Sequence, residues 1–222
     1  MMHPLVEKTA KYVKLKTYIE PAGHDWFHIE RTWRMAKHLQ SKEGGDLLLI
    51  ELAALLHDVG HHSYHEFDEE KGELALFGMM DILEIDEEMK EKVLSIVNFC
   101  KFKGDETPHP GSLEAKIVQD ANWLDSLGAL GVARTFAAGG YLGRSIYDPS
   151  VPVRTALSKN TYQKKKRQGT SMNSFFEKAY KLPLLLNTAT ARQLAEERIV
   201  YLKSFVEQFL KEWEVSEKLV SE

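Results

Sequence analysis

The helical spacing of apolar residues is the feature that most constrains the fold of this chain. Apolar side chains recur every three or four positions along almost all of the 222 residues, and the alternation of β-branched residues that marks a strand is nearly absent. Short segments rich in Gly, Pro or Asp separate the periodic stretches. The sequence therefore predicts an all-α helical bundle, with helices near residues 4–19, 25–44, 46–59, 73–85, 86–102, 112–136, 173–182 and 188–213.

The longest stretch without helical periodicity runs from about residue 137 to residue 171, and loops of this length are usually functional or mobile. We expect a long loop there, which could act as a lid, before the last two helices. We predict one domain over residues 1–222, with its core motifs in 24–137 and the C-terminal helices 173–213 packed on them. The last helix carries an apolar stripe that indicates either core packing or a homodimer interface: Leu194, Ala195, Ile199, Leu202, Val206, Phe209 and Trp213.

Composition limits the classes of partner. The net charge of −4 gives no reason to expect nucleic acid as the main partner, and the basic run 164–167 is typical of a solvated loop. Cys100 is the only cysteine, which excludes an intrachain disulfide and suits a reducing compartment. No apolar run approaches the roughly 20 residues that span a bilayer. We therefore expect a cytoplasmic protein without a membrane anchor.

Histidines are concentrated in two short stretches. Six of the nine lie there, at positions 24, 28, 57, 61, 62 and 65. A divalent metal ion needs imidazole or carboxylate donors from several segments, and three predicted helices carry them: His28, His57-Asp58, and the group Asp120, Asn122 and Asp125. A lone histidine in a helix is more often a surface or core residue than a metal ligand. His24 and His28 are four residues apart and would share one face of a helix, so this pair could also bind an ion by itself.

Two segments, "HDWFHIERTWRMA" and "LAALLHDVG", resemble the HD-domain superfamily of metal-dependent phosphohydrolases, whose signature is H…HD…D. Two later segments, 116–140 and 170–213, look like its small bacterial subgroup of HD hydrolases or nucleotide pyrophosphohydrolases. The resemblance implies that His28, His57 and Asp58 bind one divalent ion, which could be Mn, Fe, Ni, Co, Mg or Zn. The fourth ligand of the family is an Asp where this chain has Asn122. We expect the amide oxygen of Asn122 to be the fourth ligand, and Asp120 or Asp125 could take its place.

The resemblance also implies the chemistry. We expect the metal ion to activate water for attack on a phosphate ester or anhydride of a (deoxy)nucleotide, with His61 and His62 as acid or base. Substrate-binding residues are expected among His24, Arg31, Lys101, Arg134 and Lys178. Ser174 stands where the family pattern predicts a histidine. With Asn122, it leaves open an alternative, an HD-fold module that binds a nucleotide or metal ion but is catalytically weakened.

Overall fold

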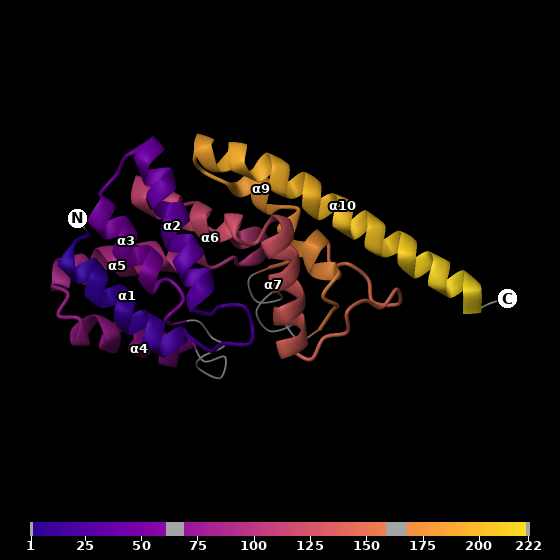
Figure 1. Ribbon diagram of the computed structural model, residues 1–222, viewed down its shortest axis with the longest axis horizontal. Helices are drawn as coiled ribbons and strands as arrows, with labels where there is room; N and C mark the ends of the chain where they lie inside the picture. Colours follow the sequence, from indigo (N-terminus) through magenta and orange to yellow (C-terminus); the bar gives the residue numbers. More distant parts are fainter. Residues whose placement is uncertain (1, 61–68, 159–167, 221–222) are drawn as a thin grey trace.

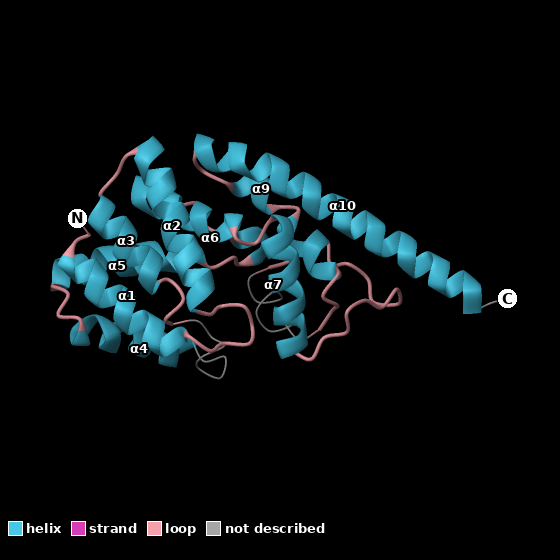
Figure 2. Ribbon diagram, in the orientation of Figure 1, coloured by secondary structure: helices cyan, strands magenta, loops and turns pink. Residues whose placement is uncertain are grey.

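The computed structural model describes residues 2–60, 69–158 and 168–220. Within those ranges every regular element is helical and no strand is present (Figure 2). The predicted all-α fold is therefore confirmed. None of the helices described is both long and apolar enough to cross a bilayer.

The first three helices build the centre of the bundle. They are α1 (Pro4–Thr17), α2 (Trp26–Glu43) and α3 (Leu47–Leu56). Eight of the ten residues of α3 are buried, and the helix packs against α1, α2, α5 and α6. A helix that is apolar on all sides has to lie inside the protein, because no face of it suits water. Residues 57–60, which follow α3, are consequently held in the interior as well.

The chain continues through α4 (Glu69–Ile82), α5 (Glu87–Cys100), the short 3-10 helix η1 (Gly104–Glu106), α6 (Leu113–Leu124) and α7 (Gly128–Tyr141). The prediction of one helix over 112–136 is wrong, because the chain turns between α6 and α7. Leu127 is extended, and Gly128 has a φ of +67°, which side-chain-bearing residues rarely adopt. Arg198 then donates to the carbonyl oxygen of Leu124 at 2.7 Å, which satisfies the end of α6.

The C-terminal part also departs from the predicted helices. The π-helical segment η2 (Phe175–Ala179) and the short α9 (Leu182–Leu185) replace the expected helix at 173–182, and α10 runs over Ala189–Val220. The backbone N–H and the guanidinium of Arg154 donate to Glu177, whose side chain is 3% exposed. This ion pair fastens the segment after α7 onto η2. Part of the predicted lid is therefore tied down by tertiary contacts.

Helix α10 lies along α6 and α7, and its C-terminal part extends past the other helices (Figure 1). Ala195, Leu202 and Val206 from its apolar stripe are buried in the core. Phe209 stacks among aromatic rings that include those of Phe136 and Tyr147. The first half of the stripe thus packs within the chain, whereas a homodimer stays a prediction. Because buried side chains from α1 to α10 form one continuous core, we propose that the described residues form one domain.

Asp120 fastens α10 to α6. Its carboxylate is fully buried and accepts hydrogen bonds of 2.8–2.9 Å from the backbone and side-chain N–H groups of Asn187 and from the backbone N–H and hydroxyl of Thr188. Burial raises the pKa of Asp120, although these donors act in the opposite direction. Thr188 directly precedes α10, so one carboxylate organises the start of the longest helix.

Removing this carboxylate should loosen the C-terminal helix. In Asp120→Ala, four donors lose their acceptor, and we expect the free energy of unfolding to fall by about 3 kcal/mol in urea denaturation. Asp86→Ala is the matched control, because Asp86 only caps the exposed start of α5 and should cost about 1 kcal/mol. Equal losses in the two variants would contradict the anchoring role.

Candidate metal centre

His28, His57 and Asp58 meet in the interior of the bundle. The Nε2 atoms of His28 and His57 are 3.3 Å apart, and Oδ2 of Asp58 lies 3.2 Å from the first and 3.5 Å from the second. The three residues are between 0% and 5% exposed. The start of α2 and the end of α3, two consecutive helices, therefore bring three potential ligand atoms to one point.

Helix ends place these side chains. Asp25 caps α2 and accepts the backbone N–H of His28 at 2.9 Å, so His28 lies in the first turn. His57 is the residue at which α3 ends, and Asp58 follows in the turn. Neighbouring residues on a regular helix point about 100° apart. Because α3 ends here, the turn can direct both His57 and Asp58 toward His28.

Hydrogen bonds on the far side of each ring fix its tautomer. Nδ1 of His57 lies 2.8 Å from the carbonyl oxygen of Ala54, and Nδ1 of His28 lies 2.7 Å from Oδ2 of Asp125. Both partners accept hydrogen bonds, which favours the tautomer with the proton on Nδ1 and the lone pair on Nε2. Two lone pairs and one carboxylate oxygen then face one another.

This arrangement fits a divalent cation. A metal ion about 2.1 Å from each nitrogen and oxygen ligand sets neighbouring ligand atoms about 3.0–3.4 Å apart in octahedral or tetrahedral geometry. Two of the three separations, 3.3 and 3.2 Å, lie in that range, and the third, 3.5 Å, lies just above it. Three buried acceptors need a positive partner at their centre, and a cation supplies it. The donor set of imidazole nitrogen and carboxylate oxygen suits Mn, Fe, Ni, Co or Zn.

The protonation states suit ligation. Burial alone would raise the pKa of Asp58, but His57, His24 and His28 outweigh it and hold the pKa well below its usual value. Desolvation lowers the pKa of His57, and it lowers that of His24 to about 4. At neutral pH the carboxylate is therefore charged, and these two imidazoles are neutral.

Asp125 holds His28 in place. Besides its contact with Nδ1 of His28, the carboxylate of Asp125 accepts two hydrogen bonds from Arg31, from Nε at 2.8 Å and from NH2 at 3.0 Å. It also lies 3.3 Å from NH1 of Arg134. Burial would raise the pKa of Asp125, but His28, Arg31 and Arg134 together lower it far below its usual value. Arg31 and Arg134, predicted to bind substrate, thus lie at the centre but contact this carboxylate.

The motif D-A-N-W-L-D divides its polar residues among different tasks. Asp120 anchors α10, and Asp125 orients His28. Asn122 directs its Nδ2 to the carbonyl oxygen of Cys100 at 3.2 Å, which Trp123 also contacts at 3.2 Å. Asp120 and Asp125, the two acids that could have served as the fourth metal ligand, are therefore held by other partners.

The structure places the other predicted residues as follows. His24 joins the centre, with Nδ1 2.7 Å from Oδ2 of Asp58. Lys101 follows the last residue of α5, and Lys178 lies in η2, which packs against α9. His61 and His62, together with His65, Glu66 and the basic run 164–167, lie outside the described residues.

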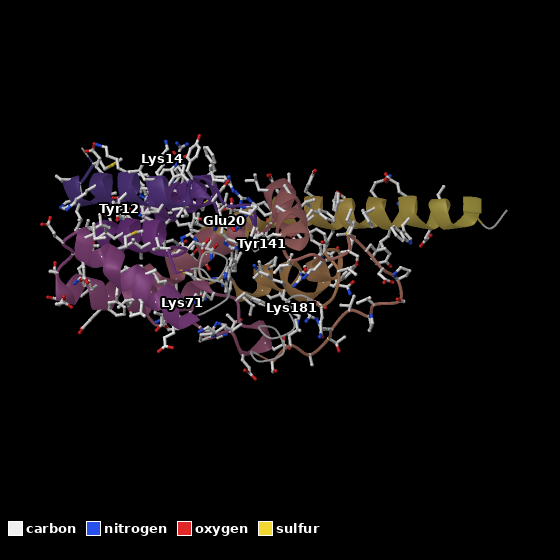
Figure 3. The ribbon with its side chains drawn as sticks, turned by 90° about the horizontal axis from the view of Figure 1, so that it is seen from below. Tyr12, Lys14, Glu20, Lys71, Tyr141 and Lys181 are labelled. Carbon is white, nitrogen blue, oxygen red and sulfur yellow. The ribbon has the colours of Figure 1, made fainter. Side chains whose placement is uncertain are left out.

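The segment before α2 contains two residues that sequence reasoning missed. Glu20, near the middle of the view in Figure 3, accepts the backbone N–H of His24 at 2.7 Å. Gly23 has a φ of +81°, and its carbonyl oxygen accepts Nε of Arg134 at 2.7 Å. The break "EPAGHD" was the only signal for this segment, and it indicated a turn without showing that the turn supports the site.

A close contact between two glycines positions the turn after α3. Gly60 and Gly72 touch backbone to backbone, and a Cβ on Gly60 would lie 2.7 Å from the carbonyl oxygen of Gly72. Real Cβ atoms do not approach that closely, so any side chain here would separate α4 from the turn that carries His57 and Asp58. Gly72 is thus coupled to the centre through the backbone.

Two alanine substitutions in α4 should behave oppositely. Gly72→Ala should push the 57–60 turn away, lowering both the free energy of unfolding, by about 2 kcal/mol, and the affinity for Mn²⁺. Gly78→Ala places a methyl group where nothing lies within 4 Å and should stabilise the helix by about 0.5–1 kcal/mol with unchanged affinity. Urea denaturation and calorimetric titration measure both quantities. Unchanged Mn²⁺ affinity in Gly72→Ala would refute the coupling.

The support of His28 by Asp125 can be tested separately. In Asp125→Asn the shape is retained, but the amide no longer selects the tautomer with the proton on Nδ1. We expect the dissociation constant for Mn²⁺ to rise about 10–100-fold, as for other partners of metal-binding histidines. Asp148→Asn, in a turn where the side chain of Asp148 binds only Ser150 among the bonds described, should leave this dissociation constant unchanged. The idea fails if both variants bind Mn²⁺ equally well.

Comparisons with known proteins point to one family. Residues 26–127 match the model of the HD domain. The protein YpgQ of Bacillus subtilis (strain 168) is 32% identical over 200 residues, which is 87% of this chain and 86% of YpgQ. A structure of YpgQ in complex with ADP has a TM-score of 0.69 at 28% identity and covers 93% of this chain and 97% of that one.

Two further solved structures are similar. One, from Lactobacillus plantarum, has a TM-score of 0.86 at 32% identity and covers 96% of this chain and 99% of its own. The other, an HD-superfamily hydrolase from Bacillus thuringiensis, is 41% identical with a TM-score of 0.66 and covers 94% and 96%. The similarity thus extends well beyond the HD motif, and the chain belongs to the HD-domain superfamily of hydrolases.

Proposed function

We propose that this protein hydrolyses a phosphate ester or anhydride of a nucleotide with the help of one divalent metal ion. The observation that carries the proposal is the meeting of two imidazole lone pairs and one carboxylate oxygen within 3.5 Å of one another. The ADP bound to YpgQ supports a nucleotide as the ligand class.

His28, His57 and Asp58 would hold the ion. When bound, a divalent ion polarises a phosphoryl oxygen and lowers the pKa of water, which makes hydrolysis of a phosphate possible near neutral pH. Asp125 keeps the lone pair of His28 directed inward. The apolar surroundings of α3 limit the access of bulk water, which strengthens the attraction between these side chains and any cation or phosphate.

Charge on the substrate needs positive partners. Arg31 and Arg134 are already paired with Asp125, so we propose that they position His28 and give only part of their charge to a phosphate. Lys101 and Lys178 remain our candidates for phosphate contacts, and His61 and His62 for proton transfer. The roles proposed for these four residues rest on the sequence analysis and on the need to neutralise phosphate charge in the transition state.

One observation favours a second candidate, a nucleotide-binding module without turnover. Asn122 brings no charge to the position where the family has an Asp, and its amide binds the carbonyl oxygen of Cys100. A weaker hold on the metal ion would reduce catalysis more than nucleotide binding. The two candidates therefore differ in turnover with the metal ion bound.

A screen of metal-loaded protein decides between them. We expect phosphate or pyrophosphate release from at least one (deoxy)nucleoside triphosphate, diphosphate or monophosphate with Mn²⁺, Co²⁺, Ni²⁺ or Mg²⁺. Activity should drop to background in His57→Ala and persist in His38→Ala, which removes an exposed imidazole from α2. Nucleotide binding without turnover, with the metal ion demonstrably bound, would instead establish the binding module.

A further inference from the structure

We propose that His24 is the fourth protein ligand of the metal ion, through Nδ1, in place of the acid that is missing at position 122. This inference rests on the proposed function, because it concerns the same ion. It changes the ligand set from two imidazoles with two carboxylates, as the family signature implies, to three imidazoles with one carboxylate.

The nearby acids are not available for this position. Both oxygens of Asp120 accept hydrogen bonds from Asn187 or Thr188, and both oxygens of Asp125 are bound by Arg31. Moving either carboxylate would leave buried donors without an acceptor, at a cost of about 1–3 kcal/mol for each donor. The sequence-based idea that one of them replaces Asn122 therefore conflicts with the packing around α6.

His24 is already at the centre. Its Nδ1 lies 2.7 Å from Oδ2 of Asp58, the same oxygen that faces His28 and His57. One ligand atom from each of His24, His28 and Asp58 lies within 4.8 Å of the other two, and this group does not include His57. The side chain of His24 is 24% exposed while that of His28 is fully buried, so His24 covers the solvent side of the group.

The segment before α2 holds His24 in this place. Glu20 accepts the backbone N–H of His24, and the carbonyl oxygen of the left-handed Gly23 accepts a hydrogen bond from Arg134 of α7. Asp25, the next residue, is fixed as the cap of α2. Three consecutive residues thus have a defined backbone, which limits the freedom that His24 would lose on binding an ion.

The proton on His24 distinguishes ligation from simple support. A neutral imidazole carries one proton. If Nδ1 gives its lone pair to the ion, the proton lies on Nε2. If His24 only orients Asp58, Nδ1 keeps the proton and donates it to Oδ2. The two roles therefore predict different signals from the same nitrogen.

Nuclear magnetic resonance with ¹¹³Cd²⁺ as the probe reads these signals directly. In full-length protein labelled with ¹⁵N-histidine, we expect ¹¹³Cd–¹⁵N coupling to Nε2 of His28, Nε2 of His57 and Nδ1 of His24. His24→Ala should remove one coupled nitrogen. It should also raise the dissociation constant for Cd²⁺ about 100-fold, which is the largest loss seen when a residue that only supports a metal ligand is removed. His38→Ala, which removes an exposed imidazole of α2, should change neither.

The wild-type protein answers the question even if His24→Ala folds poorly, because three coupled nitrogens, one of them an Nδ1, are the expected result. Coupling to His28 and His57 but a protonated, uncoupled Nδ1 on His24 would overturn this inference and leave the proposed function standing. Failure of Cd²⁺ and Mn²⁺ to bind at all would overturn both.

Discussion

The structure depends on one constraint, the meeting of two imidazole nitrogens and a carboxylate oxygen in an apolar interior. Nε2 of His28, Nε2 of His57 and Oδ2 of Asp58 lie within 3.5 Å of each other, and hydrogen bonds to Ala54 and Asp125 favour the tautomers of His57 and His28 with the proton on Nδ1. Such a cluster is unfavourable by itself and favourable around a cation. The caps of α2, the burial of α3 and the glycine contact with α4 all serve to hold it together.

The functional side chains lie where helices end. His28 is in the first turn of α2, His57 and Asp58 follow α3, and Asp125 ends α6. A helix interior sends neighbouring side chains in fixed directions, whereas a terminus can redirect them without losing hydrogen bonds in the middle of the helix. The helical bundle thus supplies stability, and the ends of its helices supply the geometry of the site.

Part of this arrangement could be predicted from the sequence. The helix starts near residues 25, 46 and 112 and the apolar α3 follow from local patterns, and the predicted meeting of the two histidines with Asp58 agrees with the observed distances. The break at Gly128 was missed because helical periodicity continues through it, while Arg198 of α10 stabilises the turn. The tasks of Asp120 and Asp125 depend on α10 and on α2, so spacing within one motif could not separate them from ligands.

Diffraction from crystals soaked with Mn²⁺, measured at the manganese absorption edge, tests the central claim most directly. The account predicts one anomalous peak about 2.1–2.3 Å from Nε2 of His28, Nε2 of His57 and Oδ2 of Asp58. A peak elsewhere, or no peak while Mn²⁺ is bound in solution, would contradict the claim that these three side chains form the metal site.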